Sequence, residues 1–491
     1  MKIFFVSILF LLNFSFSISQ DIPYFTTDFS IEEFASRREK IYEAIGKNSV
    51  AIIQGAPIPV GYTRFRQTNE FYYLCGIESP HAYLLLDGSN KRATIYLPHG
   101  MLSREAFEGK VLTSEDAEEI KQLSGINNVA SIDMLNEHLS RFSRGNSINI
   151  IYTPFSPAEG GAMGRDLATR AIADAAMDPF DGRASREGIL IQKIKEKFPS
   201  LDVKNLSPIL DQSRLIKSEK EIELIDKATR LACLALFEGM RSTVPGIFEH
   251  ELDGMAKYVY YRNGAQGEGY YSLIAAGTNA WYPHYAAGKK KLINGEFLLF
   301  DFAPDYGYYT SDITRNWPVN GKFNQWQKEL YGFYVACYKS ILDKIRPHVT
   351  AQVIMQEAAS EMETILSKSK FSKSIYEKAA KEFVESYKNS SKNQYAGLGH
   401  WVGMSVHDVG FDRGTLKPGM VFSIEPALRV PEEKIYIRLE DVIVITETGK
   451  KVLSDFLPMD IDEIEKVMKE EGILQKYPKD EFKKDAMLLK K

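Results

Sequence analysis

The chain has 491 residues, too many for one ordinary hydrophobic core, so two domains are expected. With 44% hydrophobic and 26% charged residues, it has the composition of a globular protein. Its net charge of −4 at pH 7 gives no reason to expect nucleic acid or an anionic membrane surface as a partner.

The first residues have the pattern of a secretory signal peptide. Lys2 gives a positive start, residues 3–12 form a short apolar core, and residues 17–19 (Ser-Ile-Ser) fit the small-x-small cleavage pattern. We therefore expect a signal peptide at 1–19 and export to the periplasm or the cell exterior. An uncleaved N-terminal anchor is the alternative. Since no later segment has 18 uninterrupted apolar residues, we expect no membrane span in the mature chain.

Alternating helical and strand-like patterns predict an α/β domain at residues 20–212. Asp87 and Gly88 mark a hairpin between two of its strands. The expected helices are 31–45, 113–123, 134–142, 166–176 and 189–198, and the expected strands are 49–54, 71–74, 82–87, 93–97 and 148–152.

A capping box, in which Ser218 and Glu221 cap each other's backbone, begins a second domain that we place at 213–460. Helices alternate there with strands, several of them antiparallel, so the fold class is α+β. After Asp460, a candidate N-cap, residues 461–491 form a charged helix and a Lys-rich tail. The further helices expected in the domain are 249–262, 325–345 and 351–366, and its strands are two hairpin arms within 297–319, then 420–424 and 434–445.

The three cysteines, Cys75, Cys233 and Cys337, each lie among apolar residues. An odd, unclustered set is not a disulfide framework, and its spacing excludes a thiolate zinc site. We expect three buried thiols that pack as small hydrophobic side chains.

The segment 297–319 places two acidic residues in apolar surroundings. Asp301 ends a run that reads as a buried strand, Asp312 lies in a second strand-like run, and residues 305–307 form a turn between them. A lone buried carboxylate costs several kcal/mol unless it is paired or binds a metal. Two such carboxylates on one hairpin suggest a shared cation.

Two further carboxylates lie in strand-like settings. Glu425 follows an apolar run and precedes a proline, and Glu440 lies in the segment IYIRLEDVIVI. The strand period of two places Arg438 on the same face as Glu440, where it can hold a carboxylate. Pairing with Arg438 is also the ordinary structural explanation for Glu440.

Three histidines complete the set of candidate residues. His400 and His407 lie in the glycine-rich segment 397–410, whose glycines imply close backbone approach, and His284 lies in an aromatic loop. Four carboxylates and one imidazole favour Mn²⁺ or a similar divalent ion. Five ligands suit two metals roughly 3.5–4 Å apart better than one catalytic zinc.

The order of these motifs is similar to that of a known family. Asp301, the segment DITR with Asp312, GLGHWVGMSVHDVG with His400, IEP with Glu425 and IRLED with Glu440 resemble the creatinase, aminopeptidase P and methionine aminopeptidase family of metallopeptidases, M24. The resemblance implies the "pita-bread" fold for the second domain. Creatinases lack the metal ligands, so their presence here argues for a metallopeptidase.

The resemblance also implies a role for each matching residue. Asp312 and Glu440 would bridge two metal ions, most naturally Mn²⁺, with Zn²⁺ or Co²⁺ as alternatives. The implied metal ligands are Asp301, Asp312, His400, Glu425 and Glu440, and the implied catalytic residues are His284, His407, Glu425 and Arg438. The implied reaction is attack on the scissile carbonyl by a metal-bridged hydroxide, with Glu425 as the base and a histidine stabilising the oxyanion.

A motif in the first domain restricts the resemblance to a smaller group of family members. Residues 64–76, RFRQTNEFYYLCG, resemble a motif of the aminopeptidase P N-terminal domain, which methionine aminopeptidases lack. Relatives with this domain form oligomers in which one subunit borders another's active site, and Tyr72 is our candidate for such a contribution. Many members carry a histidine four positions before the metal-binding one, where this chain has Ala396, and that change bears on specificity.

The expected function is therefore an exported Xaa-Pro aminopeptidase with peptide substrates that carry proline second, acting as a homodimer or higher oligomer. A proline ring needs its own pocket, for which the candidates are Tyr270, Tyr271, Trp281 and Tyr282. The alternatives are an Xaa-Pro dipeptidase (prolidase) and a metal-free peptide-binding pseudoenzyme.

Overall fold

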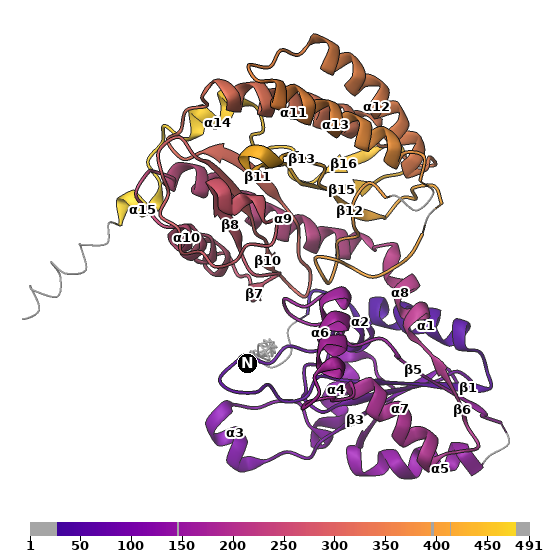
Figure 1. Cartoon of the computed structure of the whole chain (residues 1–491). Coiled ribbons are helices and arrows are strands. Elements are labelled where there is room, and N and C mark those ends of the chain that lie inside the picture. Colours follow the sequence, from indigo (N-terminus) through magenta and orange to yellow (C-terminus); the bar gives the residue numbers. More distant parts are fainter. Residues whose placement is uncertain (1–26, 145–146, 394–396, 413, 478–491) are drawn as a thin grey trace, which may run out of the picture.

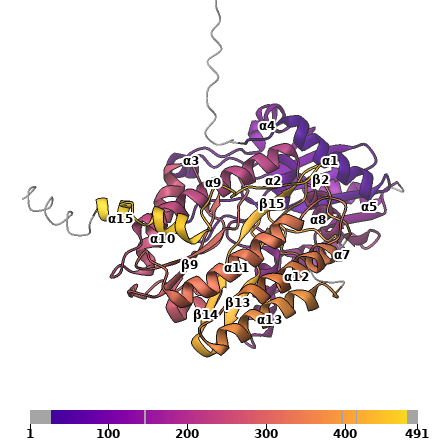
Figure 2. The same ribbon diagram turned by 90° about the horizontal axis from the view of Figure 1, so that it is seen from above.

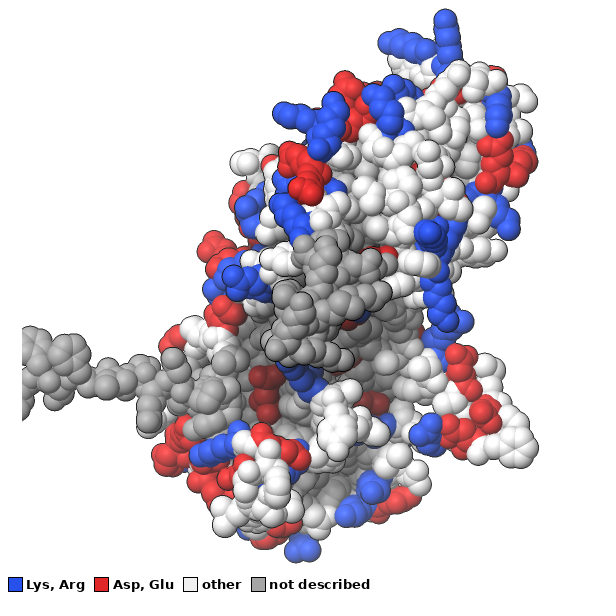
Figure 3. Space-filling model, turned by 90° about the vertical axis from the view of Figure 1, so that its left-hand side faces the viewer, with Lys and Arg blue, Asp and Glu red and all other residues white. Residues whose placement is uncertain are grey.

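The computed structural model describes residues 27–144, 147–393, 397–412 and 414–477, which form two stacked domains joined through helix α8, Ser207–Leu215 (Figure 1). The expected signal peptide, Ala396 and the Lys-rich tail from 478 on lie outside these residues. In the described part of the chain, no helix is long and apolar enough to cross a membrane. Acidic and basic side chains are interspersed on both domains over the face drawn in Figure 3.

The N-terminal domain is built on a six-stranded mixed sheet in the order β4-β3-β2-β1-β5-β6. Alternate residues of its strand β1 belong to different apolar clusters, Ala51 and Ile53 to one and Val50 and Ile52 to the other, so the sheet is buried on both faces. Its strands are β1 (Ser49–Gln54), β2 (Tyr83–Asp87), β3 (Arg92–Leu97), β4 (Asn128–Ser131), β5 (Ile150–Thr153) and β6 (Asp202–Asn205). Its helices before α8 are α1 (Ile31–Ile45), α2 (Asn69–Cys75), α3 (Leu102–Glu108), α4 (Ala117–Ser124), α5 (Leu135–Arg144), α6 (Arg165–Met177) and α7 (Arg186–Lys197), with the 3₁₀ turns η1 (Ser114–Asp116) and η2 (Ile132–Met134).

One expected strand of this domain is wrong. Residues 71–74 belong to helix α2, whose seven residues are all buried. A helix without a solvated face shows no 3.6-residue polar periodicity, so its apolar run is indistinguishable from a buried strand. The predicted Asp87 hairpin is confirmed by the antiparallel pairing of β2 and β3.

The C-terminal domain has short antiparallel sheets enclosed by helices, which confirms the α+β prediction. Helices α11–α13 lie on one side of the strands and α9 and α10 on the other (Figures 1 and 2). The helices are α9 (Glu219–Ser242), α10 (Glu249–Arg262), α11 (Gln325–Lys344), α12 (Ala351–Lys368), α13 (Ser374–Ser390), α14 (Ile461–Val467) and α15 (Ile473–Lys476), with η3 (Gly277–Trp281) and η4 (Pro431–Glu433). The strands are β7 (Gly267–Glu268), β8 (Leu273–Ala276), β9 (Phe297–Asp301), β10 (Pro304–Asp305), β11 (Thr314–Pro318), β12 (Val421–Ile424), β13 (Ala427–Val430), β14 (Ile435–Arg438), β15 (Asp441–Ile445) and β16 (Lys450–Val452).

Local signals set several of these boundaries. The predicted capping box at Ser218 begins α9, with the Ser218 hydroxyl accepting from Glu221 N–H and the Glu221 carboxylate accepting from Ser218 N–H. Asp460 does stand at the N-cap of α14, but its side chain makes no cap hydrogen bond there and pairs with Lys339 instead. Cys75, Cys233 and Cys337 are free and buried, as predicted.

Two strand expectations in this domain need correction. The run 434–445 is divided into β14 and β15, because the strand partner changes from β13 to β12 and Glu440 between them bridges to Thr314 of β11. Asp312 lies two residues before β11, not inside it. In both cases a predicted ligand stands next to a strand end.

The two domains meet at the tip of the β10–β11 connection. Tyr308 stacks on Tyr72 of α2, and Arg66 forms an ion pair with Asp305 at 2.6 Å. Because Tyr72 is 2% exposed and faces this contact, the expectation that it reaches another subunit's active site is wrong.

Candidate metal centre

Two of the five predicted ligands come from the β9–β11 hairpin. Asp301 ends β9, where its backbone pairs with Thr314, and Asp312 lies just before that partner. Both carboxylates are buried. The Tyr270 hydroxyl lies 2.6 Å from Asp301 Oδ1 and 2.8 Å from Asp312 Oδ1 and joins the two carboxylates by hydrogen bonds.

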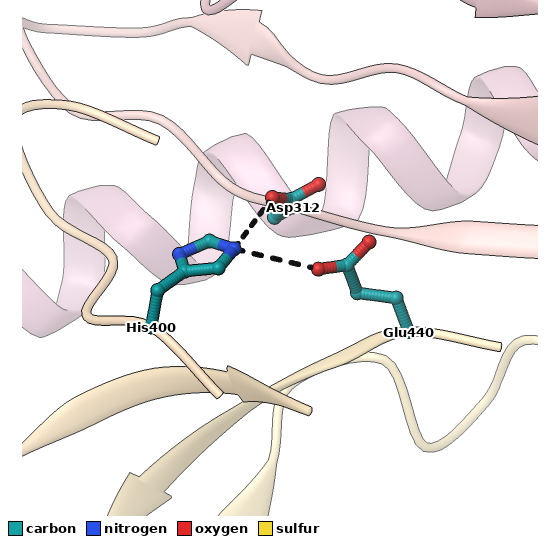
Figure 4. A group of neighbouring side chains, drawn as sticks. All are labelled: Asp312, His400 and Glu440. Carbon is teal, nitrogen blue, oxygen red and sulfur yellow. Dashed lines mark ion pairs between the residues drawn. The ribbon is translucent and has the colours of Figure 1, made fainter. Parts of the chain in front are cut away.

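The imidazole of His400 points one ring nitrogen toward the carboxylates of Asp312 and Glu440 (Figure 4). Its Nε2 is 3.2 Å from Asp312 Oδ2, 3.4 Å from Glu425 Oε1 and 3.7 Å from Glu440 Oε1. The backbone around it is tightly packed, since a Cβ on Gly399 would lie 1.9 Å from the carbonyl oxygen of Ser423. Glycine at that position therefore lets His400 approach β12.

Arg438, at the end of β14, places its guanidinium between two of the carboxylates. It donates to Glu425 Oε2 at 2.8 Å and forms a close ion pair with Asp301 Oδ2. Its Nη2 is 3.8 Å from Glu440 Oε2. As predicted, the side chains of Arg438 and Glu440 point to the same side, although the strand is interrupted between them. Arg438 contacts Asp301 and Glu425 more closely than Glu440.

Burial and mutual repulsion raise the pKa values of two of the acids, Asp301 and Glu440. Burial, opposed by Arg438, raises the pKa of Asp301 to about 6. Burial together with the nearby Asp312 and Glu425 carboxylates raises the pKa of Glu440 to about 7. Burial would lower the pKa of His400, but its contacts with three carboxylates outweigh it and raise that pKa. The buried site therefore has an excess of negative charge.

The residues present fit divalent metal ions. Asp312, His400 and Glu440 offer ligand atoms that all lie within 4.8 Å of one another. His400 Nε2 and Glu440 Oε1 are buried without a hydrogen-bond partner, as expected of atoms that bind an ion. His400 Nδ1 is 3.2 Å from the carbonyl oxygen of Trp401, a contact that fixes the ring with Nε2 toward the carboxylates.

A cavity of about 140 Å³ opens beside this cluster. Predicted site residues line it together with two residues of the N-terminal domain, Asp166 and Leu167. These two residues belong to none of the sequence motifs, so the sequence did not indicate them. The lining comprises Asp166, Leu167, Tyr270, Tyr271, Leu273, His284, Asp301, Asp312, His400, Val406, His407, Glu425 and Arg438.

The aromatic residues expected to bind a proline ring are divided between two places. Tyr270 and Tyr271 line the cavity, whereas Trp281 and Tyr282 are not among its lining residues. Trp281 packs instead on a small apolar cluster around Tyr436. Tyr270 has a role that its sequence context did not indicate, since its hydroxyl binds the two aspartates.

A buried group of carboxylates around an imidazole, in the helix-enclosed domain of a two-domain chain, defines a metal-dependent hydrolase. Residues 223–447 match the model of metallopeptidase family M24, and residues 34–152 match that of the aminopeptidase P N-terminal domain. The chain belongs to metallopeptidase family M24, and it is a metallo-aminopeptidase.

Relatives match in sequence and in structure. A protein of Escherichia coli K12 named Xaa-Pro aminopeptidase is 29% identical over 469 residues, covering 90% of this chain and 98% of the relative. An Xaa-Pro dipeptidase of Pyrococcus horikoshii is 30% identical over 269 residues, 54% of this chain and 69% of the relative. The structure of aminopeptidase P from E. coli with the inhibitor Pro-Leu has a TM-score of 0.70 at 27% identity, covering 90% and 98% of the two chains.

Proposed function

We propose that this protein is an exported Xaa-Pro aminopeptidase, which removes from a peptide the N-terminal residue that precedes proline. The observation that carries the proposal is that the match to the Xaa-Pro aminopeptidase of E. coli spans both domains, whereas the match to the Xaa-Pro dipeptidase covers about half of the chain. The N-terminal domain also lines the cavity through Asp166 and Leu167, so both domains belong to the proposed site.

The proposed cofactor is a pair of divalent ions, Mn²⁺ before Zn²⁺ or Co²⁺, because the donors are mainly carboxylate oxygens. The residues that would hold them are Asp301, Asp312, His400, Glu425 and Glu440. When bound, the ions supply Lewis-acid polarisation of the scissile carbonyl and a lowered pKa for a water molecule.

The protein's own groups supply proton transfer and orientation. Glu425, whose Oε2 is held by Arg438, accepts the proton of the attacking water at Oε1. His284 and His407 face the same cavity and stabilise the negative charge that develops on the carbonyl oxygen. Arg438 also keeps Asp301 and Glu425 apart and oriented, since it binds one oxygen of each.

Export and assembly are separate parts of the proposal. Export is supported by the signal-peptide pattern of residues 1–19. Assembly into a homodimer or higher oligomer is supported by the resemblance to oligomeric relatives that carry the same N-terminal domain. N-terminal sequencing of the secreted protein and light scattering after gel filtration test the two parts independently.

A substrate panel tests the activity. The full chain is stripped with a chelator, reloaded with Mn²⁺, Zn²⁺ or Co²⁺, and assayed on Xaa-Pro, on Xaa-Pro-Xaa-Xaa and on the matched Xaa-Ala-Xaa-Xaa. We expect release of the first residue from the tetrapeptide with proline and not from the one with alanine. Cleavage of the dipeptide alone would indicate a dipeptidase. A protein that retains no metal and stays inert after reloading would be a peptide-binding pseudoenzyme.

A further inference from the structure

Helix α6 of the N-terminal domain begins at the wall of the cavity that holds the candidate metal centre. Asp166 and Leu167, in its first turn, line that cavity beside His284 and His407. The chain segment that precedes the helix is close as well, because a Cβ on Gly164 would lie 3.4 Å from the carbonyl oxygen of His407. Residues 165–177 lie outside both matched family segments, so no motif led to this contact.

The contact between the domains includes a hydrogen bond to a predicted catalytic residue. Asp166 Oδ2 lies 2.8 Å from His407 Nδ1, across 241 residues of sequence. Burial alone would raise the pKa of Asp166, but the hydrogen bond and the charge of His407 outweigh burial and lower it. An ionised carboxylate only accepts hydrogen bonds, so the proton between the two groups belongs to His407 Nδ1.

This hydrogen bond determines which atom of His407 is available for chemistry. With Nδ1–H bound to Asp166, the other ring nitrogen, Nε2, is left for a substrate in the cavity. The backbone of this loop is anchored separately, since the adjacent Asp408 is held by Lys217 at 2.9 Å. The His407 ring itself is 40% exposed, so its orientation depends on side-chain contacts such as the one with Asp166.

We propose that Asp166 is a positioning residue of the active site, by which the N-terminal domain fixes the tautomer and the orientation of His407 in the same chain. The inference rests on the proposed function in that His407 acts on a bound peptide. It deepens that proposal, because it gives helix α6 a part in the reaction beyond domain packing.

Substitutions at Asp166 in the full-length, metal-loaded enzyme test the proposal. Asp166→Ala removes the acceptor, and we expect kcat to fall about 10-fold or more while KM changes less than about 3-fold. Asp166→Asn keeps an oxygen that accepts from Nδ1–H, so we expect it to retain more activity than the alanine variant. Asp174→Ala is the matched control, because Asp174 lies on the same helix and is exposed. A kcat of Asp166→Ala equal to that of the wild type would overturn the proposal.

A double-mutant cycle separates action through His407 from a general structural effect. If Asp166 acts through His407, Asp166→Ala has no further effect on kcat in a His407→Ala background. Independent, multiplying losses in the double variant would show that Asp166 acts by another route, and the proposal would fail.

A spectroscopic measurement tests the same contact without any substrate. In ¹⁵N-histidine NMR spectra of the metal-free protein at pH 8.5, we expect the His407 signal, assigned by its loss in His407→Ala, to show a protonated Nδ1. In Asp166→Ala we expect protonation to shift toward Nε2, whereas an unchanged spectrum would contradict the proposal. If the wild type cleaves no proline peptide, the proposed function fails, while the NMR result still decides the role of Asp166.

Discussion

Tyr308, at the tip of the connection between the two aspartate ligands, stacks face to face on Tyr72 of helix α2, with ring centroids 3.5 Å apart and an angle of 5° between the planes. Both side chains are buried. Tyr308 also has a φ of 71°, in the left-handed region that a bulky residue rarely adopts. The N-terminal domain therefore contacts the hairpin of Asp301 and Asp312 through a locally strained residue.

Two replacements of Tyr308 should separate the stabilisation by the ring stack from the cost of the strained backbone. Tyr308→Ala removes the ring but keeps a Cβ at positive φ, and we expect a loss of about 2–4 kcal/mol in the free energy of unfolding. Tyr308→Gly also removes the ring but relieves the strain, so it should lose about 1 kcal/mol less. Denaturant titration measures the order, and an alanine variant as stable as the wild type would contradict the docking role.

Removal of one predicted bridging ligand should weaken metal binding. For Asp312→Asn we expect at least a 100-fold loss of hydrolysis and a metal content below that of the wild type, because the amide carries no charge. Asp305→Asn is the matched control on the same hairpin, since Asp305 pairs with Arg66 away from the site. Elemental analysis and peptide assays give the result, and hydrolysis that survives in Asp312→Asn would show the metal assignment to be wrong.

Arg438 and the metal ions should stabilise the same carboxylates. In Arg438→Met the buried Asp301 and the partly exposed Glu425 lose their shared cation, so we expect the metal-free protein to unfold at a lower temperature. Divalent ions restore positive charge, and the rise in Tm on adding metal should therefore be larger than in the wild type. Arg429→Met, on the neighbouring strand β13, is the control. Equal metal-induced shifts in all three proteins would contradict this coupling.

The sequence predicted the long amphipathic elements and the ligand set better than the short buried elements. Helix α10 has the predicted bounds, since Asn263 and Gly264 end it and its buried residues Leu252, Ala256 and Tyr260 have helical spacing. The apolar run of helix α2 predicts a strand instead, because burial on every side removes the polar periodicity of a helix. Helix α13 is not among the expected helices, although Tyr376, Ala380 and Phe383 have helical spacing.

In the candidate site, too, residues in local motifs could be predicted from the sequence, whereas contacts between distant segments could not. Asp301, Asp312 and Glu440 lie in recognisable motifs. In the structure the side chains of Asp312 and Glu440 meet at His400, and Asp301 is joined to Asp312 through the Tyr270 hydroxyl. No local pattern relates Asp166 to His407 across 241 residues, because that contact depends on how the two domains pack. A motif therefore predicts the ligands, while the packing of the fold provides the residues that orient them.

Glu70, in helix α2, should make stability depend on pH. Burial, and then repulsion by Glu159, raises its pKa from the ordinary 4.5 to about 7. The folded state thus binds more protons than the unfolded state between these values, and stability falls as the pH rises through that window. Glu70→Gln stays neutral, so its free energy of unfolding relative to the wild type should increase by on the order of 1–3 kcal/mol from pH 5 to pH 8. Its Tm relative to the wild type should increase in the same direction.

Thermal unfolding at intervals of one pH unit measures this difference, with Asp174→Asn as the exposed control. A Tm difference between Glu70→Gln and the wild type that is constant or decreases with pH would contradict the raised pKa.

Asp408, next to His407, joins the active-site loop to the region that links the domains. It accepts hydrogen bonds from Arg214 and from Lys217, and all three side chains are about 1% exposed. Burial would raise the pKa of Asp408, but the two cations outweigh it and lower that pKa below the ordinary 3.8. The stabilisation is therefore present above pH 3.8 and is lost as the pH falls through the folded-state pKa.

Asp408→Asn should destabilise the protein strongly at pH 7, because it leaves two buried cations beside a neutral amide. We expect a loss of about 3–5 kcal/mol in the free energy of unfolding. The double variant Asp408→Leu with Lys217→Met removes one cation together with its partner, and Arg214 keeps Glu159 at 2.8 Å, so much of that loss should be recovered. Denaturant unfolding at pH 7 compares the variants. If the double variant is less stable than Asp408→Asn, the unpaired charge is not the cause of the loss, and the contact acts through its shape.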